Sequence, residues 1–402
     1  MATPLMLIAE PMPRRGAPGG PAPRGWPGLR LGFRPFYLAA ALMAVIAMAL
    51  WPAVFMGRLR LGSAVAPTLW HAHEMLLGVM VAVVVGFLFT AGRTWTGLDT
   101  PRGAALGGLV ALWALGRLAG LLGPGWAFAL LDGAFLPLVA VLFARLIVRA
   151  RQGRNALVAG VLALLGVANL AFHAAVLGLR QVDPMRTLQA ALALLLVLES
   201  VIGGRVIPAF TRSVNPGLAL RDRRQLDRAA IAVTALGLAW WIAELPGAAA
   251  PLALAAGLQG VRLAAWKPWM ARRRPILWIL HLAYAWIPAG LGLLALATVG
   301  VVARSAGVHA LAVGATGGLV LGMITRTARG HTGRELKASP AEVAAYVALT
   351  GAAILRVTAA LAPRWFEPAV CGAGVLWILA FGLYVLRFGP WLMQPRVDGK
   401  DG

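Results

Sequence analysis

Residues 70–92 read WHAHEMLLGVMVAVVVGFLFTAG: two histidines and a glutamate stand at the mouth of an almost unbroken apolar run. About 20 apolar residues is the length that a helix needs to cross the hydrocarbon core of a bilayer, where the backbone must hydrogen-bond to itself. The run does not alternate between polar and apolar residues, as a strand of a membrane barrel would. This stretch therefore predicts a transmembrane helix with ionisable groups at one end.

Similar apolar runs recur along the chain. Of its 402 residues, 60% are hydrophobic and only 13% are charged, which leaves too little polar surface for a soluble globule. The eighth run is the weakest, because it is short and carries Gln259 and Arg262. We predict an all-α polytopic membrane bundle of about 12 transmembrane helices, at roughly residues 35–55, 72–92, 104–122, 126–148, 156–178, 187–208, 229–246, 249–266, 276–302, 306–326, 341–361 and 367–388.

The basic residues predict the topology. The formal net charge is +23, and basic residues of polytopic proteins concentrate in cytoplasmic loops. If the N-terminus is cytoplasmic, about 29 of the 37 Lys and Arg residues fall in inside segments, so we expect both termini to be cytoplasmic. The charge then needs no nucleic-acid partner, because anionic headgroups of the lipid bilayer suffice. We expect a disordered cytoplasmic tail (1–30), one transmembrane domain (31–392) and a second cytoplasmic tail (393–402).

Histidines gather in one half of this bundle. Under the predicted topology the outer half holds His71, His73, His173, His309, Glu74, Asp132, Glu244 and Arg117. Histidine at membrane depth is rare and usually functional, which favours a metal or haem ligand over an interfacial pair bonded to headgroups and water. His71 and His73 lie two residues apart and project to different sides of a helix, so only one of them can face a given site.

Purely structural roles stay open for several of these groups. His173 is as well explained by a hydrogen bond between helices as by ligation. Arg117 and Asp132 flank a short turn and predict an ion pair without direct chemistry. Glu199, near the middle of the sixth span, predicts a structural partner for an arginine or a hydroxyl. The single cysteine, Cys371, excludes an intrachain disulfide and any cysteine-based metal cluster.

The inner half has its own polar set. Gly203 and Gly204 allow a close helix approach or a cofactor lying against the backbone. Arginines and hydroxyls in glycine-broken segments can clamp an anion such as a haem propionate or a quinone head group. The candidate residues for this role are Arg205, Arg326 and Arg334, with His281 and His331 as inner metal ligands.

Seven blocks fall in order along nearly the whole chain: Leu31–Phe36, Trp70–Met75, Gly204–Thr211, Leu277–His281, His309–Leu311, Gly330–Arg334 and Pro395–Gly399. These blocks, above all Gly-His-Thr-Gly-Arg and Trp-His-Ala-His-Glu-Met together, resemble the NnrS family. The resemblance implies a bacterial inner-membrane protein that contains haem and copper and is linked to the nitric oxide response and to denitrification. It does not supply a mechanism. Arg329 stands before Gly-His-Thr-Gly-Arg where an apolar residue would be expected.

The first functional hypothesis is a haem and copper protein that handles nitric oxide, with a quinone or another redox partner as electron source. Neutral imidazole suits both b-type haem and copper, and the absence of Cys-x-x-Cys-His excludes covalent haem attachment. We expect His73 and His309 as the axial pair, with His71 and His173 as further outer ligands. His281 and His331 would hold a second metal or cap the same cofactor from below, and a five-coordinate haem with one histidine is the variant. Whether the protein turns over a substrate stays open.

Two other classes compete with this hypothesis. A transporter for a metal or a small molecule would line its path with the histidines and Glu199, although no inverted repeat is evident in the sequence. A scaffold that protects a metalloprotein during nitrosative stress would bind a stable partner and no ligand of its own. Bound haem separates the first hypothesis from both alternatives.

Overall fold

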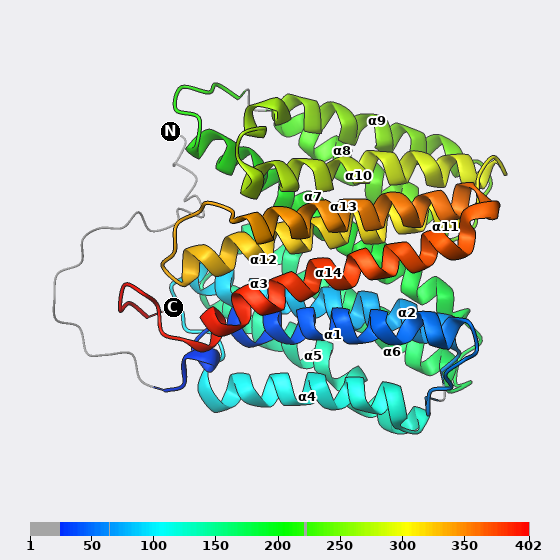
Figure 1. The fold of residues 1–402 in the computed structure, drawn as a ribbon, viewed down its shortest axis with the longest axis horizontal. Coiled ribbons are helices and arrows are strands. Elements are labelled where there is room, and N and C mark those ends of the chain that lie inside the picture. Colours follow the sequence, from blue (N-terminus) through cyan, green and yellow to red (C-terminus); the bar gives the residue numbers. More distant parts are fainter. Residues whose placement is uncertain (1–24, 64, 221–222, 402) are drawn as a thin grey trace.

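A computed structural model describes residues 25–63, 65–220 and 223–401, and every regular element in these ranges is a helix (Figure 1). The long helices run side by side along one axis of the molecule. The helices are α1 (Phe33–Phe55), α2 (Pro67–His73), η2 (Glu74–Met80), α3 (Val81–Thr96), α4 (Gly103–Leu122), α5 (Gly125–Arg149), α6 (Ala156–Val176), α7 (Pro184–Ser213), α8 (Arg224–Ile242), α9 (Ala249–Ala265), α10 (Pro275–Thr298), α11 (Arg304–His309), η5 (Ala310–Gly317), α12 (Gly318–His331), α13 (Pro340–Leu361) and α14 (Phe366–Met393).

The predicted polytopic helical membrane bundle is confirmed. Among the described residues, ten helices are long and apolar enough to cross a membrane. Each of the twelve predicted spans coincides with a helix or with consecutive helical segments, but α8 and α9 do not meet that criterion of length and composition. The first turn of α8 is charged, and α9 has only 17 residues. Of the predicted N-terminal tail, residues 1–24 lie outside the described part.

Two continuous rods form the centre of the bundle. In the most apolar stretch of Pro67–Thr96, 89% of the residues are buried, and in that of Arg304–His331, 72% are buried, against 33–56% in the other eight candidate spans. The first rod is α2, η2 and α3, and the second is α11, η5 and α12. Because the other helices surround them, side chains on these two rods face protein on most sides.

Each central rod contains a π-helical segment that begins one residue after a histidine. η2 follows His73 and η5 follows His309, and the two segments pack against each other. Helices with i→i+5 hydrogen bonds are rare and occur frequently at functional sites. η5 is rich in small residues, and the missing side chain of Gly314 makes room for the indole of Trp286 on α10. The irregular backbone therefore lies where the two rods meet.

Local sequence signals set several helix ends. Proline occupies the first helical position of α2, α7, α10 and α13, where its missing N–H costs nothing. Ser339 and Glu342 form a capping box at the start of α13, and Asp183 accepts a hydrogen bond from the Met185 amide (2.9 Å) at the start of α7. Gly97 ends α3 in the left-handed region, at φ +70°.

The described chain begins and ends at the same end of the bundle, which we call the terminal end (Figure 1). The opposite end, where α1 ends and α2 begins, is the far end. Buried Arg34, at the start of α1, donates hydrogen bonds to the carbonyls of Leu392 (2.9 Å) and Gln394 (2.7 Å) and so joins the first helix to the last. The segment after α14 folds back, since the Val397 amide donates to the Thr332 carbonyl (3.3 Å).

Candidate functional site

His71 and His73 point into two different sites near the far end. They lie on α2, four and six residues after the helix begins at Pro67, which places them about 6–9 Å along the helix axis. His73 contacts side chains of α5 and α6, whereas His71 lines a cavity between α1, α7, α11, α13 and α14. The sequence prediction that the two rings project to different sides is confirmed.

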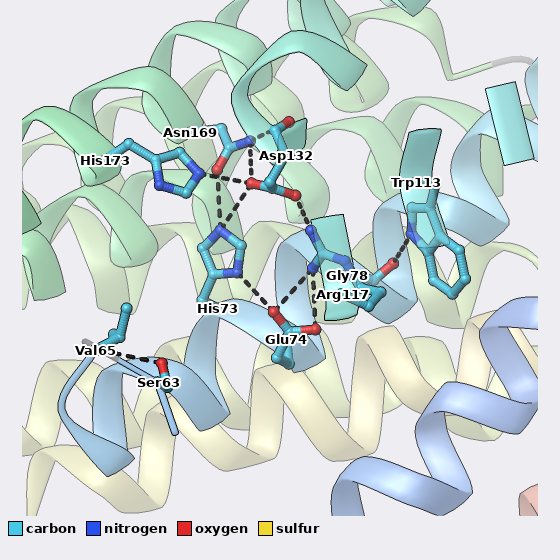
Figure 2. A network of polar contacts seen from close by, with 10 residues as sticks. All are labelled: Ser63, Val65, His73, Glu74, Gly78, Trp113, Arg117, Asp132, Asn169 and His173. Carbon is cyan, nitrogen blue, oxygen red and sulfur yellow. Dashed lines mark hydrogen bonds and ion pairs between the residues drawn. The ribbon is translucent and has the colours of Figure 1, made fainter. Parts of the chain in front are cut away.

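The first site is a fully buried cluster around Asp132 on α5 (Figure 2). Asp132 Oδ2 accepts hydrogen bonds from His173 Nε2 (2.7 Å) and Asn169 Nδ2 (2.8 Å), both on α6. His73 Nε2 lies 3.3 Å from the same oxygen and 3.0 Å from Asn169 Oδ1. The ring of Phe172 packs 4.6 Å from the His73 ring and closes the site with an apolar wall. One carboxylate oxygen therefore gathers two imidazoles.

Arg117 on α4 links this cluster to a second carboxylate. Its Nη1 donates to both oxygens of Glu74 (3.0 Å each), and its Nη2 pairs with Asp132. The predicted Arg117–Asp132 ion pair is confirmed, but it is one part of a larger cluster. The approach depends on Gly78 in η2, where a Cβ would lie 2.7 Å from Arg117 Nη1. The Gly78 carbonyl, inside the π-helical segment, accepts a hydrogen bond from Trp113 Nε1 (3.0 Å).

The fixed charges of the cluster sum to one negative charge, since Arg117 balances only one of the two carboxylates. Asn169 turns its amide nitrogen to the Asp132 carboxylate, so its oxygen faces His73 Nε2 and accepts a hydrogen bond from it. His73 Nδ1 in turn faces Glu74 Oε1 at 3.3 Å. His73 thus has an oxygen near each ring nitrogen, and a metal cation held by the cluster would balance its negative charge.

His73, Asp132 and His173 also form a metal-ligand set. One ligand atom from each lies within 4.8 Å of the others, and all three residues are buried. Two imidazoles and one carboxylate suit first-row metals such as copper, iron or zinc. Glu74, next to His73 Nδ1, would act as the outer partner of that ring, because ligating histidines usually engage a hydrogen-bond partner through their second nitrogen, and Asn169 Nδ2 would hold the Asp132 carboxylate.

The second site is a cavity of about 290 Å³ lined by His71 and His309. This volume is at the lower limit of the ~300–1,000 Å³ typical of small-molecule and cofactor sites. His71 stacks on Trp51 of α1, with 4.1 Å between ring centroids and 14° between planes. His71 Nδ1 is buried and has no hydrogen-bond partner among the described residues.

His309 is oriented as a ligand. Its Nδ1 lies 2.8 Å from the carbonyl of Ser305, one helical turn earlier, and a carbonyl can only accept, so Nδ1 carries the proton. Its Nε2 then keeps a free lone pair, and within the described ranges no protein hydrogen bond to that atom is formed. This is the arrangement in which a backbone carbonyl fixes the tautomer of a metal-ligating histidine. Since His71 and His309 line the same cavity, they offer a ligand from each central rod.

The cavity wall combines soft, flat and small side chains. Four methionines, two tryptophans and several small residues line it, and none of its lining residues is a carboxylate. These methionine, tryptophan and small residues are Met48, Met75, Met80, Met185, Trp51, Trp377, Ala72, Ala312, Ala352, Ala373 and Gly374. Arg356 on α13 is the charged residue of the lining, and its Nη1 is buried without a partner among the described residues. A planar apolar molecule with an anionic group fits these walls.

The structure thus groups the outer histidines differently from the sequence prediction. His73 pairs with His173 around Asp132, and His309 shares a cavity with His71. The expected axial pair of His73 and His309 is not brought together, because the side chain of His73 faces α5 and α6, away from the cavity. Two sites, side by side on one central rod, replace the single site that the sequence predicted.

The three inner arginines do not line the cavity, and each contacts other groups near the terminal end. Arg205 donates to Asn155 Oδ1 (3.1 Å), Arg326 lies 3.8 Å from the ring centre of Phe210, and Arg334 lies 4.2 Å from that of Trp391. Gly204 does allow a close approach, but the group that lies against it is the guanidinium of Arg262. The predicted clamp for a propionate or a quinone is thus not assembled from these residues.

The inner histidines also lie apart. His281 Nε2 donates to Thr211 Oγ1 (2.9 Å), whose own proton goes to the Ile207 carbonyl. His331 packs on Phe33 at 5.4 Å, and its carbonyl accepts from Arg396 (3.1 Å). No hydrogen bond or ring contact joins the two histidines in the part of the chain that the structure describes. Each is explained by its own packing.

Two residues that matter here were not singled out from the sequence. Asn169 precedes His173 by four positions and therefore lies on the same face of α6, a spacing that could have marked it. Arg356 is an ionisable residue inside a predicted span, which is itself a functional signal. No sequence pattern predicted the π-helical segments η2 and η5.

Residues 27–396 match the NnrS family, described as NnrS protein. No curated protein matches the chain. The matched range includes both far-end sites and the blocks Trp70–Met75 and Gly330–Arg334 that carry the resemblance. Because the match covers nearly the whole described chain and the fold is the expected helical membrane bundle, the protein belongs to the NnrS family.

Proposed function

We propose that this protein binds haem b and copper in the bacterial inner membrane and acts in the response to nitric oxide, with a link to denitrification. Membership of the NnrS family supports the nitric oxide response. The orientation of His309 carries the cofactor part: its Nδ1 is held by the Ser305 carbonyl, and its free Nε2 shares the cavity with His71.

The residues present fit a haem in the cavity. His71 and His309 come from the two central rods, and the tryptophan, methionine and small side chains form apolar walls for a macrocycle. The protein positions the ligand rings through the Ser305 carbonyl and through the stack of His71 on Trp51. Bound haem iron would supply a coordination position for nitric oxide when only one imidazole ligates it.

The cluster around Asp132 fits a copper ion. His73 and His173 supply imidazole nitrogens, and Asp132 supplies a carboxylate oxygen. Since His71 and His73 are separated by one residue, the chain itself connects the two sites. The residues would hold the metal away from bulk water, because all of them are buried.

Absorption spectra of the detergent-purified protein, oxidised, reduced and reduced with nitric oxide, test the proposal. We expect a Soret band that shifts with nitric oxide, and iron and copper by metal analysis. His309→Ala should lose or change the band, and His73→Ala should lower copper with the band retained. His281→Ala is the matched control and should keep both metals. A protein that contains no iron after expression with ample haem would refute the haem assignment.

Transport remains the second candidate because of Glu199. This carboxylate on α7 accepts a hydrogen bond from Thr316 of η5 (3.2 Å) and lines an otherwise apolar cavity of about 80 Å³. A carboxyl group at this depth is a feature of transport paths. Proteoliposome uptake of copper that requires Glu199, in a protein without haem, would favour transport over the first proposal.

A further inference from the structure

Arg356 carries a charge that the described protein does not balance. It lies on α13, five residues before the helix ends at Leu361, and lines the cavity together with His71 and His309. Its Nη1 is buried without a hydrogen-bond partner, and no ion pair among the described residues includes it. No carboxylate lines the cavity. The other titratable side chains of the lining are the two histidines, and Thr68 is uncharged, so with neutral imidazoles the lining has a formal charge of +1.

Three buried arginines of the bundle show what the half-buried Arg356 lacks. Arg117 pairs with two carboxylates, and Arg329 donates to both oxygens of Glu342 at 2.6 Å. Arg262 has Asp227 as its acceptor (2.6 Å). Leaving a buried charge unpaired is strongly unfavourable, because the lost hydration is not replaced. The fold thus supplies acceptors for these three arginines and leaves Arg356 open toward the cavity.

We propose that Arg356 binds a carboxylate of the molecule that occupies the cavity. A guanidinium presents parallel N–H groups that match the two oxygens of a carboxylate. The apolar walls fit the body of an amphipathic ligand, and the imidazoles fit its metal, so the three kinds of group together specify an anionic metallo-macrocycle. This assignment rests on the proposed haem site. The same chemistry serves a small free oxyanion, which is the other source of a carboxylate-like group.

The position of Arg356 separates this role from that of an interfacial anchor. Arg364 lies beyond the end of α13, is exposed, and stacks near Trp365 (5.9 Å from the ring centre). Arg356 lies about 7.5 Å deeper along the helix and turns toward the cavity. Arg364 therefore serves as the matched control for a general loss of positive charge.

The experiment compares two probes on the full-length protein purified without haem. One is iron protoporphyrin IX with free carboxylates, and the other is its dimethyl ester, which has the same macrocycle and metal but no negative charge. We expect the wild type to bind the free acid ~10–100-fold more tightly than the ester, the range expected for charged hydrogen bonds. Arg356→Gln should bind both equally, Arg356→Lys should recover part of the preference, and Arg364→Gln should keep all of it.

The outcomes separate this inference from the proposed function. Equal binding of acid and ester by the wild type, or an unchanged preference in Arg356→Gln, would overturn the role of Arg356 while leaving haem in place. If the wild type binds neither probe, the haem site fails, and melting temperatures with acetate and nitrite decide the rest. A stabilisation lost only in Arg356→Gln would assign Arg356 to a free oxyanion. No stabilisation of the wild type would overturn the inference.

Discussion

Replacing Arg117 with glutamine tests the charge balance of the Asp132 cluster. The Arg117 side chain is 5% exposed, Glu74 is fully buried and Asp132 is 3% exposed. The substitution leaves two buried carboxylates without the guanidinium that pairs with both of them. Removing one partner of a buried ion pair costs about 3–5 kcal/mol, because the other charge stays buried and unpaired. We expect this loss in the free energy of unfolding, measured by SDS titration in mixed micelles.

The control is an exposed pair at the same end of the bundle. Arg186 pairs with Glu244, and their side chains are 44% and 45% exposed. Exposed pairs contribute about 0–1 kcal/mol, so Arg186→Gln should have little effect. The contrast removes any general effect of losing one positive charge from the protein.

The double variant Arg117→Gln/Glu74→Gln tests whether charge balance stabilises the cluster. It returns the net charge of the cluster to its wild-type value, so it should be less unstable than the two single variants predict together, with a coupling of about 1–3 kcal/mol. If the effects simply add, or if Arg117→Gln costs no more than Arg186→Gln, then the cluster is not held by charge balance.

Two further predictions concern other parts of the chain. Gly78→Ala should cost about 1–3 kcal/mol in the same titration, because a Cβ there would press on Arg117, whereas Gly160→Ala, with nothing within 4 Å, should be neutral or stabilising. Hydrogen bonds from Arg396 lower the pKa of Asp398 from 3.8 to about 2. Its contribution to docking of the C-terminal segment is therefore complete above about pH 4 and lost as the pH falls toward 2. The protection factor of the Val397 amide, which corrects for intrinsic exchange at each pH, should fall over that range in the wild type; an equal fall in Asp398→Asn would contradict this.

The fold was predictable because bilayer physics limits the choices. An apolar run of about 20 residues must form a helix, so each predicted span coincides with helical structure. The broken centres of the second and tenth spans were not predictable in the same way. A π-helical segment depends on tertiary partners such as Trp113 on the Gly78 carbonyl, and local sequence does not encode such a partner.

Which histidines would meet was only partly predictable. Periodicity correctly separates His71 from His73, because two residues turn a helix by about 200°. It cannot say which neighbouring helix each face meets, since that follows from the packing order of the bundle. The pairing of His73 with His309 assumed that both faced one cavity, but α5 and α6 pack against the His73 face of α2.

The first central rod contributes a histidine to each of the two sites. A single central rod carries His71 toward the cavity and His73 toward Asp132, and a π-helical segment begins directly after them. On the second rod, the π-helical segment η5 likewise begins directly after His309, and η2 and η5 pack against each other. A shift in either segment would therefore move a cavity ligand on one rod and change the contact with the other.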